Sequence, residues 1–224
     1  MDILVSDLSF KVSEGGNERI ILDSINYKFE HSKITTISGP SGSGKTTLLY
    51  ALAGLLDIFE GDVEIMNKRI YTLSSIQRDK FRLENIGVIF QNLNLMPFMN
   101  VQDNILLPFY LRGTKITKEI FNKLNEYLEI LGLGEIREKP INTLSGGEQQ
   151  RIAIIRSMLS EPNIILCDEP TGSLDSKNAI KFMDSIVKLN KINKTTIIIV
   201  THDELVNNYG EAKVKMHDGK IIMN

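Results

Sequence analysis

A glycine-rich stretch, GPSGSGKTT, has the residue types and spacing of a phosphate-binding loop. It follows the apolar run Ile34–Ser38, which predicts a strand, and precedes a helix predicted at residues 46–53. Glycines let the backbone turn tightly and bring its N–H groups close to an anion. The lysine can reach the β- and γ-oxygens of a triphosphate, and the hydroxyl after it can ligate Mg²⁺. The residues predicted to bind the nucleotide are Gly39, Pro40, Ser41, Gly42, Ser43, Gly44, Lys45, Thr46 and Thr47.

Two adjacent carboxylates, Asp168 and Glu169, follow the apolar run at residues 164–167, which predicts a buried strand. Because side chains alternate along a strand, the two carboxylates point in different directions and can take different roles. Asp168, facing the phosphate loop, can hold Mg²⁺ through its water shell. Glu169 is then free to polarise a water for in-line attack on the γ-phosphate. Two solvated loop carboxylates are the alternative, which the preceding phosphate loop and strand disfavour.

The octapeptide LSGGEQQR contains a second glycine pair. Ser145, with Glu148 three residues later, predicts a capping box, so a well-started helix is one interpretation. However, Gly146 and Gly147 in the first turn reduce helix propensity by about 1 kcal/mol each relative to alanine. Something other than helix stability must favour them, and exposed N–H groups at this helix start predict a second anion site.

The segments around these motifs predict an α/β fold. Continuous apolar runs indicate strands covered on both faces, as in a parallel sheet, and the partly alternating N-terminal segments indicate an antiparallel β layer. The expected strands lie at residues 3–12, 20–29, 34–38, 63–65, 86–90, 164–167, 195–201, 212–216 and 220–223, and the expected helices at 46–53, 74–82, 101–111, 117–131, 145–160 and 177–191.

The chain of 224 residues is long enough for one large α/β domain. The stretch from residue 92 to about 140 lacks strong strand runs and has helical spacing, which predicts a helical subdomain insert. We therefore predict a single domain over residues 1–224. Within it, residues 1–91 and 141–224 form the nucleotide-binding core with its β layer.

Composition argues against several classes of partner and compartment. Charged residues make up 24% of the chain with a net charge of −2, and scattered Lys and Arg predict no nucleic-acid surface. The single cysteine, Cys167, lies in an apolar run and suits a reducing cytosolic compartment. Neither a signal peptide nor a span of about 20 apolar residues is present, so we expect any membrane role to come through a partner.

Taken together, the motifs resemble those of the ATP-binding cassette (ABC) ATPase subunits, over nearly the whole chain and in the family's order. Three short patterns, Phe90-Gln91, Asn94 to Pro97 and Leu107-Pro108, resemble the lipoprotein-release and macrolide-export branch. The matching motifs are GPSGSGKT as Walker A, Gln91 as the Q-loop, LSGGEQQR as the signature, ILCDEP as Walker B, residues 172–175 as the D-loop and His202 as the switch histidine.

The resemblance implies a P-loop NTPase core in which two ATP molecules are bound between two copies packed head to tail. Ser145, Gly146 and Gly147 of one copy would complete the phosphate site of the other, and Asp175 would cross the interface. By the same resemblance, Gln91 senses Mg²⁺ and the lytic water, and His202 bonds the γ-phosphate and steadies Glu169. The implied ligands are ATP and Mg²⁺.

The resemblance also implies a function and a location. The chain would be the cytoplasmic ATPase of a transporter, held on the inner face of the cell membrane by a separate integral-membrane permease, and an exporter. An ATPase that drives a mechanical or regulatory membrane complex without translocation fits the same sequence. A small-molecule kinase with the same phosphate loop is disfavoured by the signature and by His202.

One departure from the family pattern concerns the nucleotide base. The family usually stacks adenine on an aromatic residue of the early strand, where this chain has Val12. Phe10 lies two residues earlier and, by strand alternation, on the same face. Either Phe10 contacts adenine in its place or base stacking is weak.

Overall fold

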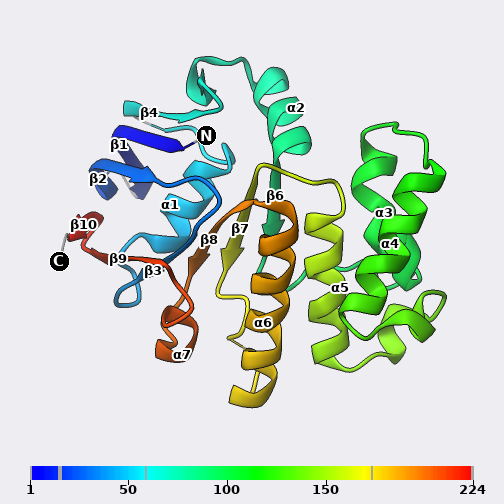
Figure 1. The fold of residues 1–224 in the computed structure, drawn as a ribbon. Helices are drawn as coiled ribbons and strands as arrows, with labels where there is room; N and C mark the ends of the chain where they lie inside the picture. Colours follow the sequence, from blue (N-terminus) through cyan, green and yellow to red (C-terminus); the bar gives the residue numbers. More distant parts are fainter. Residues whose placement is uncertain (1, 15–16, 59, 173, 223–224) are drawn as a thin grey trace.

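The computed structural model describes residues 2–14, 17–58, 60–172 and 174–222. The parts of the sequence prediction that fall on Ser173 and Met223 lie outside the described residues. Among the described residues, six strands form the central sheet in the order β10-β9-β3-β8-β7-β6, parallel except between β9 and β10 (Figure 1). These strands are β3 (Ile34–Ser38), β6 (Ile86–Ile89), β7 (Ile164–Asp168), β8 (Thr196–Val200), β9 (Ala212–His217) and β10 (Lys220–Ile222).

Every position of β7 and β8 is buried, as their unbroken apolar runs predict. Successive side chains face two different cores. Ile164 and Leu166 pack with the antiparallel layer, whereas Ile165 and Cys167 pack with helices on the other face of the sheet. Burial raises the pKa of the Cys167 thiol, so the thiol stays protonated and packs as a small apolar side chain.

The antiparallel layer has the strand order β2-β1-β4-β5 and covers one face of the central sheet. The turn between β4 and β5 places Met66 and Asn67 at φ 55° and 60°, the left-handed conformation of a tight hairpin. The β1–β2 pairing shifts register on both sides of Phe10, so strand alternation is interrupted there. The strands are β1 (Ile3–Glu14), β2 (Asn17–Phe29), β4 (Glu60–Ile65) and β5 (Lys68–Arg69).

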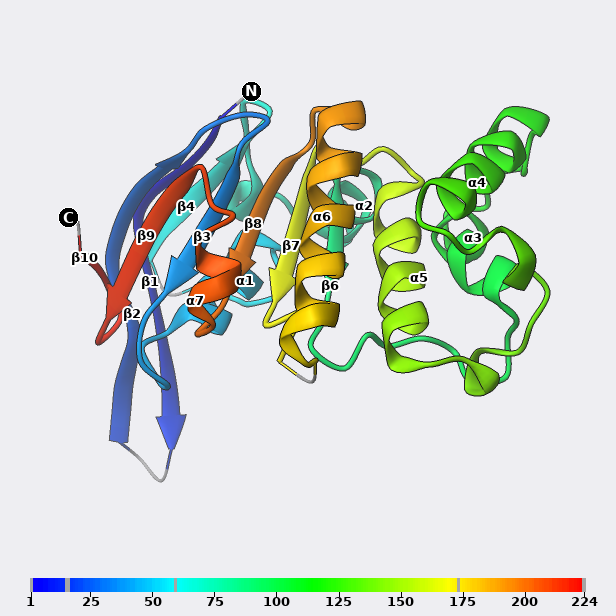
Figure 2. The same cartoon turned by 60° about the horizontal axis from the view of Figure 1, so that its bottom comes forward.

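Helices lie on both faces of the central sheet, with α1 under the antiparallel layer and α5 and α6 on the opposite side (Figures 1 and 2). All but α1 begin at a residue whose side chain accepts a backbone N–H bond, and these caps include Ser74, Thr117 and the predicted Ser145. The helices are α1 (Lys45–Leu52), α2 (Ser75–Asn85), α3 (Val101–Leu111), α4 (Lys118–Ile130), α5 (Gly146–Met158), α6 (Ser176–Asn193) and α7 (Glu204–Asn207).

The segment between β6 and α5 contains α3 and α4, which Figure 2 shows beyond α5 at the far end of the molecule. The loop before α3 is held by the buried Asn104, whose side-chain amide donates to the Met96 carbonyl at 3.0 Å and accepts from the Met96 N–H at 2.7 Å. This loop follows Gln91 directly in the chain. None of the helices in the described part of the chain is long and apolar enough to span a membrane.

Candidate functional site

The glycine-rich loop lies between β3 and α1 and is packed tightly against neighbouring strands. A Cβ atom on Gly39 (φ 150°) would lie 2.2 Å from the Met216 carbonyl oxygen of β9. A Cβ atom on Gly44 (φ 95°) would lie 2.8 Å from the Ile21 carbonyl oxygen of β2. Glycine is therefore required at both positions by close approach as well as by backbone conformation.

Lys45 holds this loop closed. Its side chain is 6% exposed, and Nζ donates to the carbonyl oxygens of Gly39 (2.9 Å) and Pro40 (2.8 Å). The N-terminus of α1, unlike those of the longer helices, has no side-chain cap. Its first turn also carries no acidic residue. Its N–H groups and dipole are therefore suited to an anionic ligand, and a nucleotide phosphate fits this loop on the chemistry of its donors.

A pocket of about 290 Å³ opens over the loop. It brings six of the predicted loop residues together with Glu169, which is more than 120 residues away in the sequence. It also includes Arg19 and Ile21 of β2, which the sequence did not indicate. The only sequence signal for them was their position on the strand that pairs with the segment around Val12. The lining residues are Arg19, Ile21, Ser41, Gly42, Gly44, Lys45, Thr46, Thr47 and Glu169.

Phe10 does not line this pocket. It is half-buried and packs against the apolar core under the antiparallel layer. The physical reason is the register shift on each side of Phe10, which breaks the alternation that placed it on the same face as Val12.

Asp168 ends β7 beside the start of α1 and is 6% exposed. Its Oδ1 accepts from the Thr46 hydroxyl at 2.9 Å, and its Oδ2 accepts from the Tyr50 hydroxyl at 3.1 Å. No set of three His, Cys, Asp or Glu side chains within the described ranges could enclose a metal. The Thr46 hydroxyl and the Asp168 carboxylate, next to a phosphate loop, nevertheless fit Mg²⁺. This ion keeps several waters and takes its remaining ligands from phosphates, so it needs few protein ligands.

Glu169 lies at the turn after β7 with φ 43°, a left-handed conformation that is uncommon outside glycine and frequent at active sites. A hydrogen bond from its N–H to the Val200 carbonyl (3.0 Å) fixes the turn. Its Oε1 is 3.2 Å from Nδ1 of His202. The carboxylate of Glu169 is 25% exposed and His202 is 65% exposed, so both can reach a ligand at the pocket rim.

Gln91 approaches the same carboxylate from the end of β6. A Cβ atom built on Gly172 would lie 3.4 Å from Nε2 of Gln91 and 3.8 Å from Oε2 of Glu169. The carboxyl ends of β6, β7 and β8 thus bring together Gln91, Asp168, Glu169 and His202, which were predicted from three separate motifs.

The predicted second anion site lies elsewhere on the chain. At the start of α5, the Ser145 hydroxyl donates to Oε2 of Glu148 at 2.6 Å and accepts from the Glu148 N–H at 3.4 Å, completing the capping box. Asp175 lines the same pocket as Ser145. It is the N-cap of α6, and its side chain accepts a hydrogen bond from the Asn178 N–H at 2.8 Å. This pocket, of about 510 Å³, is lined by Ser145, Gly146, Gly147, Glu148, Arg151, Leu174, Asp175, Asn178 and Lys181.

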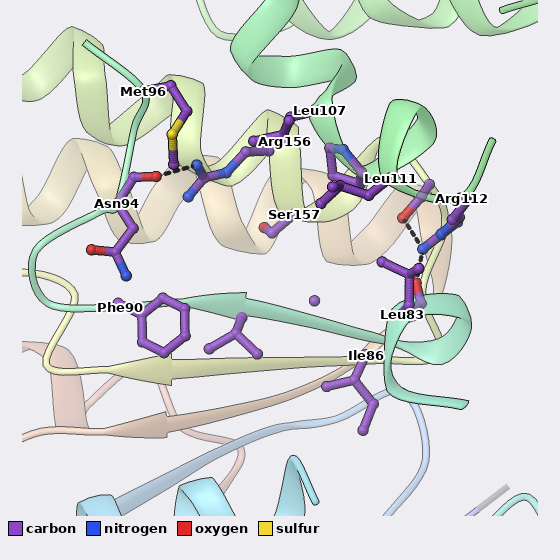
Figure 3. A pocket seen from close by; sticks show the side chains of 14 residues that line it. Leu83, Ile86, Phe90, Asn94, Met96, Leu107, Leu111, Arg112, Arg156 and Ser157 are labelled. Atoms are coloured by element: carbon purple, nitrogen blue, oxygen red, sulfur yellow. Dashed lines mark hydrogen bonds between the residues drawn. The ribbon is translucent and has the colours of Figure 1, made fainter. Parts of the chain in front are cut away.

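A third pocket, of about 240 Å³, lies between β6, α3 and α5 and is mainly apolar (Figure 3). Arg156 crosses it from α5 and donates to the backbone carbonyls of Leu93 and Asn94. Desolvation lowers the pKa of the Arg156 guanidinium. The apolar side chains that line this third pocket are Leu83, Ile86, Val88, Phe90, Met96, Leu107, Pro108 and Leu111.

Comparison with known proteins is consistent with this geometry. Residues 22–172 match the family model described as "ABC transporter". The hemin import ATP-binding protein HrtA of Staphylococcus epidermidis is 37% identical, covering 99% of each chain. The lipoprotein-releasing system ATP-binding protein LolD of Colwellia psychrerythraea is 38% identical, covering 96% of this chain and 83% of LolD.

Solved structures agree with these sequence matches. The dimeric structure of MJ0796, an ABC transporter cassette of Methanocaldococcus jannaschii, has a TM-score of 0.88 at 34% identity and covers 99% of this chain and 97% of that chain. The same TM-score is found for the post-hydrolysis state of MJ0796 bound to ADP and Pi. The chain therefore belongs to the ABC transporter family, in which it is an ATP-hydrolysing nucleotide-binding subunit.

Proposed function

We propose that two copies of this chain bind head to tail around two ATP molecules, hydrolyse them with Mg²⁺ and drive a separate integral-membrane permease. The observation that carries the proposal is the separation of two half-sites: the pocket of Lys45 and the pocket of Ser145 share no lining residue. A phosphate loop leaves the γ-phosphate open on one side, so the missing donors must come from a second molecule. The head-to-tail arrangement supplies them from the Ser145 pocket of the twin copy.

In each shared site, Glu169 accepts a proton from the attacking water. The water oxygen forms a bond to the γ-phosphorus as the bond to the ADP oxygen breaks, giving ADP and phosphate. His202, 3.2 Å from Glu169, orients the carboxylate and bonds the γ-phosphate. When ATP binds, the Lys45 ammonium exchanges its hydrogen bonds to the Gly39 and Pro40 carbonyls for hydrogen bonds to the β- and γ-phosphate oxygens. The bonds to phosphate are stronger because both partners are charged.

Thr46 and Asp168 would hold the magnesium ion, and Gln91 would complete its protein ligands from the end of β6. The ion, when bound, neutralises negative charge on the β- and γ-phosphates. Because Gln91 continues directly into the loop that lines the third pocket, its position depends on whatever occupies that pocket.

A mixing experiment tests the shared site. Lys45→Ala and Ser145→Arg chains should each be inactive alone, because each lacks one half of every site. Mixed in equal amounts, they form pairs in which one site combines the intact loop of one copy with the intact Ser145 end of the other. We therefore expect the mixture to recover at least about a tenth of wild-type ATPase activity. A mixture no more active than the separate chains, with both variants folded, would show that each chain works alone.

The permease would dock a cytoplasmic helix at the third pocket. This pocket is mainly apolar, and Asn94 and Met96 of the loop that follows Gln91 line it (Figure 3). A helix docked there would contact the loop that continues from the γ-phosphate sensor. On that loop, Phe98 is 79% exposed and Leu95 packs only partly on the core. An apolar side chain with so much exposed surface is suited to a protein partner.

Substitution of this rim should separate docking from chemistry. We expect Leu95→Ala with Phe98→Ala to reduce co-purification of the permease at least fivefold and to leave the ATPase activity of the isolated subunit within about twofold of wild type. Ile76→Ala, at an 80% exposed apolar residue of α2, is the matched control and should change neither. Unchanged co-purification in the double variant would rule out docking at this rim.

Export, and attachment to the inner face of the membrane through the permease, complete the proposal. Support for export comes from the motif details of the lipoprotein-release and macrolide-export branch and from the similarity to LolD. The name of HrtA refers to import, so the direction of transport needs its own measurement. ATP-dependent movement of substrate out of cells, lost in the Glu169→Gln variant, is the expected result. Permease-linked ATPase activity without such movement would favour the mechanical alternative.

A further inference from the structure

The pocket over the phosphate loop has two sides, defined by the order of the central sheet. Glu169 follows β7, which lies two strands away from β3 on the β8 side. β2 approaches the loop from the opposite side, since the N–H of Asp23 bonds the carbonyl of Gly219 (3.0 Å) in the turn after β9, the other neighbour of β3. A nucleotide with its γ-phosphate near Glu169 therefore extends its ribose and base towards β2.

Two side chains of β2 line the pocket on this side, Arg19 and Ile21. They are two residues apart on one strand and so share a face. Arg19 is exposed, and within the described residues no carboxylate pairs with it, whereas the neighbouring Glu18 is bound to Lys11 at 2.8 Å. Arg19 also lies directly opposite Val12 in the β1–β2 register, where the family's aromatic residue is missing.

We propose that Arg19 stacks its guanidinium plane on the adenine ring and that Ile21 packs beside it, so that an arginine and an aliphatic side chain replace the aromatic residue. This inference rests on the proposed function, because it needs the nucleotide in the loop pocket. A guanidinium is planar, weakly hydrated and stacks well on π-systems, and a cation over an aromatic face gains electrostatic energy. Phe10, which packs on the core, takes no part in this contact.

The test compares ligands with and without a base. Binding of Mg-ADP and of inorganic pyrophosphate is measured by calorimetry on the full chain, so neither turnover nor dimerisation is required. We expect Arg19→Ala to weaken ADP binding about 5–30-fold, in line with stacking contributions of a base on a side chain, and to leave pyrophosphate binding within twofold. Arg19→Tyr, which restores a planar ring without the charge, should bind ADP within about threefold of wild type.

Lys28→Ala removes an exposed lysine elsewhere on β2 and serves as the matched control, with no expected change for either ligand. Unchanged ADP binding in Arg19→Ala would overturn the proposal, and so would an equal loss for ADP and pyrophosphate, which would make Arg19 a phosphate ligand. Failure of the proposed function would look different. In that case Lys45→Ala would bind both ligands as wild type does.

Discussion

Replacing Glu169 with glutamine is expected to lower the rate of ATP hydrolysis by about 100- to 10,000-fold, the range that a positioned general base contributes. An amide has the same shape as the carboxylate but does not accept a proton from water at neutral pH. Glutamine can still bond Nδ1 of His202, at the position where Oε1 of Glu169 lies 3.2 Å away. Turnover is measured as phosphate release at saturating Mg-ATP.

The same variant should retain ATP binding and accumulate as a dimer, because the nucleotide that joins the two copies is no longer consumed. Size-exclusion chromatography with light scattering in Mg-ATP and in Mg-ADP would compare the two states. Glu204→Gln, an exposed carboxylate at the start of α7, is the control and should hydrolyse ATP normally. Turnover above a tenth of the wild-type rate in Glu169→Gln would remove Glu169 from the role of base.

Replacing Lys45 with alanine is expected to weaken ATP binding about 30- to 100-fold, the effect of losing charge-assisted hydrogen bonds to a phosphate. The ammonium group also joins the carbonyls of Gly39 and Pro40, so its loss loosens the loop even without nucleotide. We therefore expect a small decrease in melting temperature as well as the loss of affinity. Calorimetric titration with Mg-ATP and a thermal melt measure the two effects separately.

Lys177→Ala, in the exposed first turn of α6, provides a matched removal of a lysine and should bind ATP normally. If Lys45→Ala bound ATP with wild-type affinity while folding correctly, the phosphate loop would not be the nucleotide site. The melt distinguishes a loss of ATP binding from simple misfolding, because it reports folding on the same sample.

The sequence predicted most of the fold because its local signals are consistent with each other. The run that forms β8 is apolar or β-branched throughout, and the structure buries every residue of it. Ser145 with Glu148 predicted the start of α5, and both capping bonds are present. The short α7 was missed because four residues are too few to display helical periodicity. The start of α6 was placed too late, since Asp175 was considered only for a role at an interface.

The candidate site was predictable residue by residue but not in its layout. Lys45, Asp168 and Glu169 each follow a local pattern that reports its own chemistry. The contribution of Arg19 depends instead on how β2 packs against the loop, which is a tertiary contact with no local signal. Phe10 shows the same limit, because strand alternation predicted its direction and a register shift changed it.

The capping box at Ser145 has a consequence for how firmly two copies hold together. A serine hydroxyl can donate one hydrogen bond, and Ser145 already donates it to the Glu148 carboxylate. That hydrogen bond lowers the pKa of Glu148. An incoming phosphate must displace this carboxylate and then sit close to its negative charge. When the dimer closes, the Ser145 hydroxyl thus exchanges its hydrogen bond to Glu148 for one to the phosphate, with little net gain in free energy. We therefore expect the two copies to dissociate readily once the γ-phosphate has been cleaved.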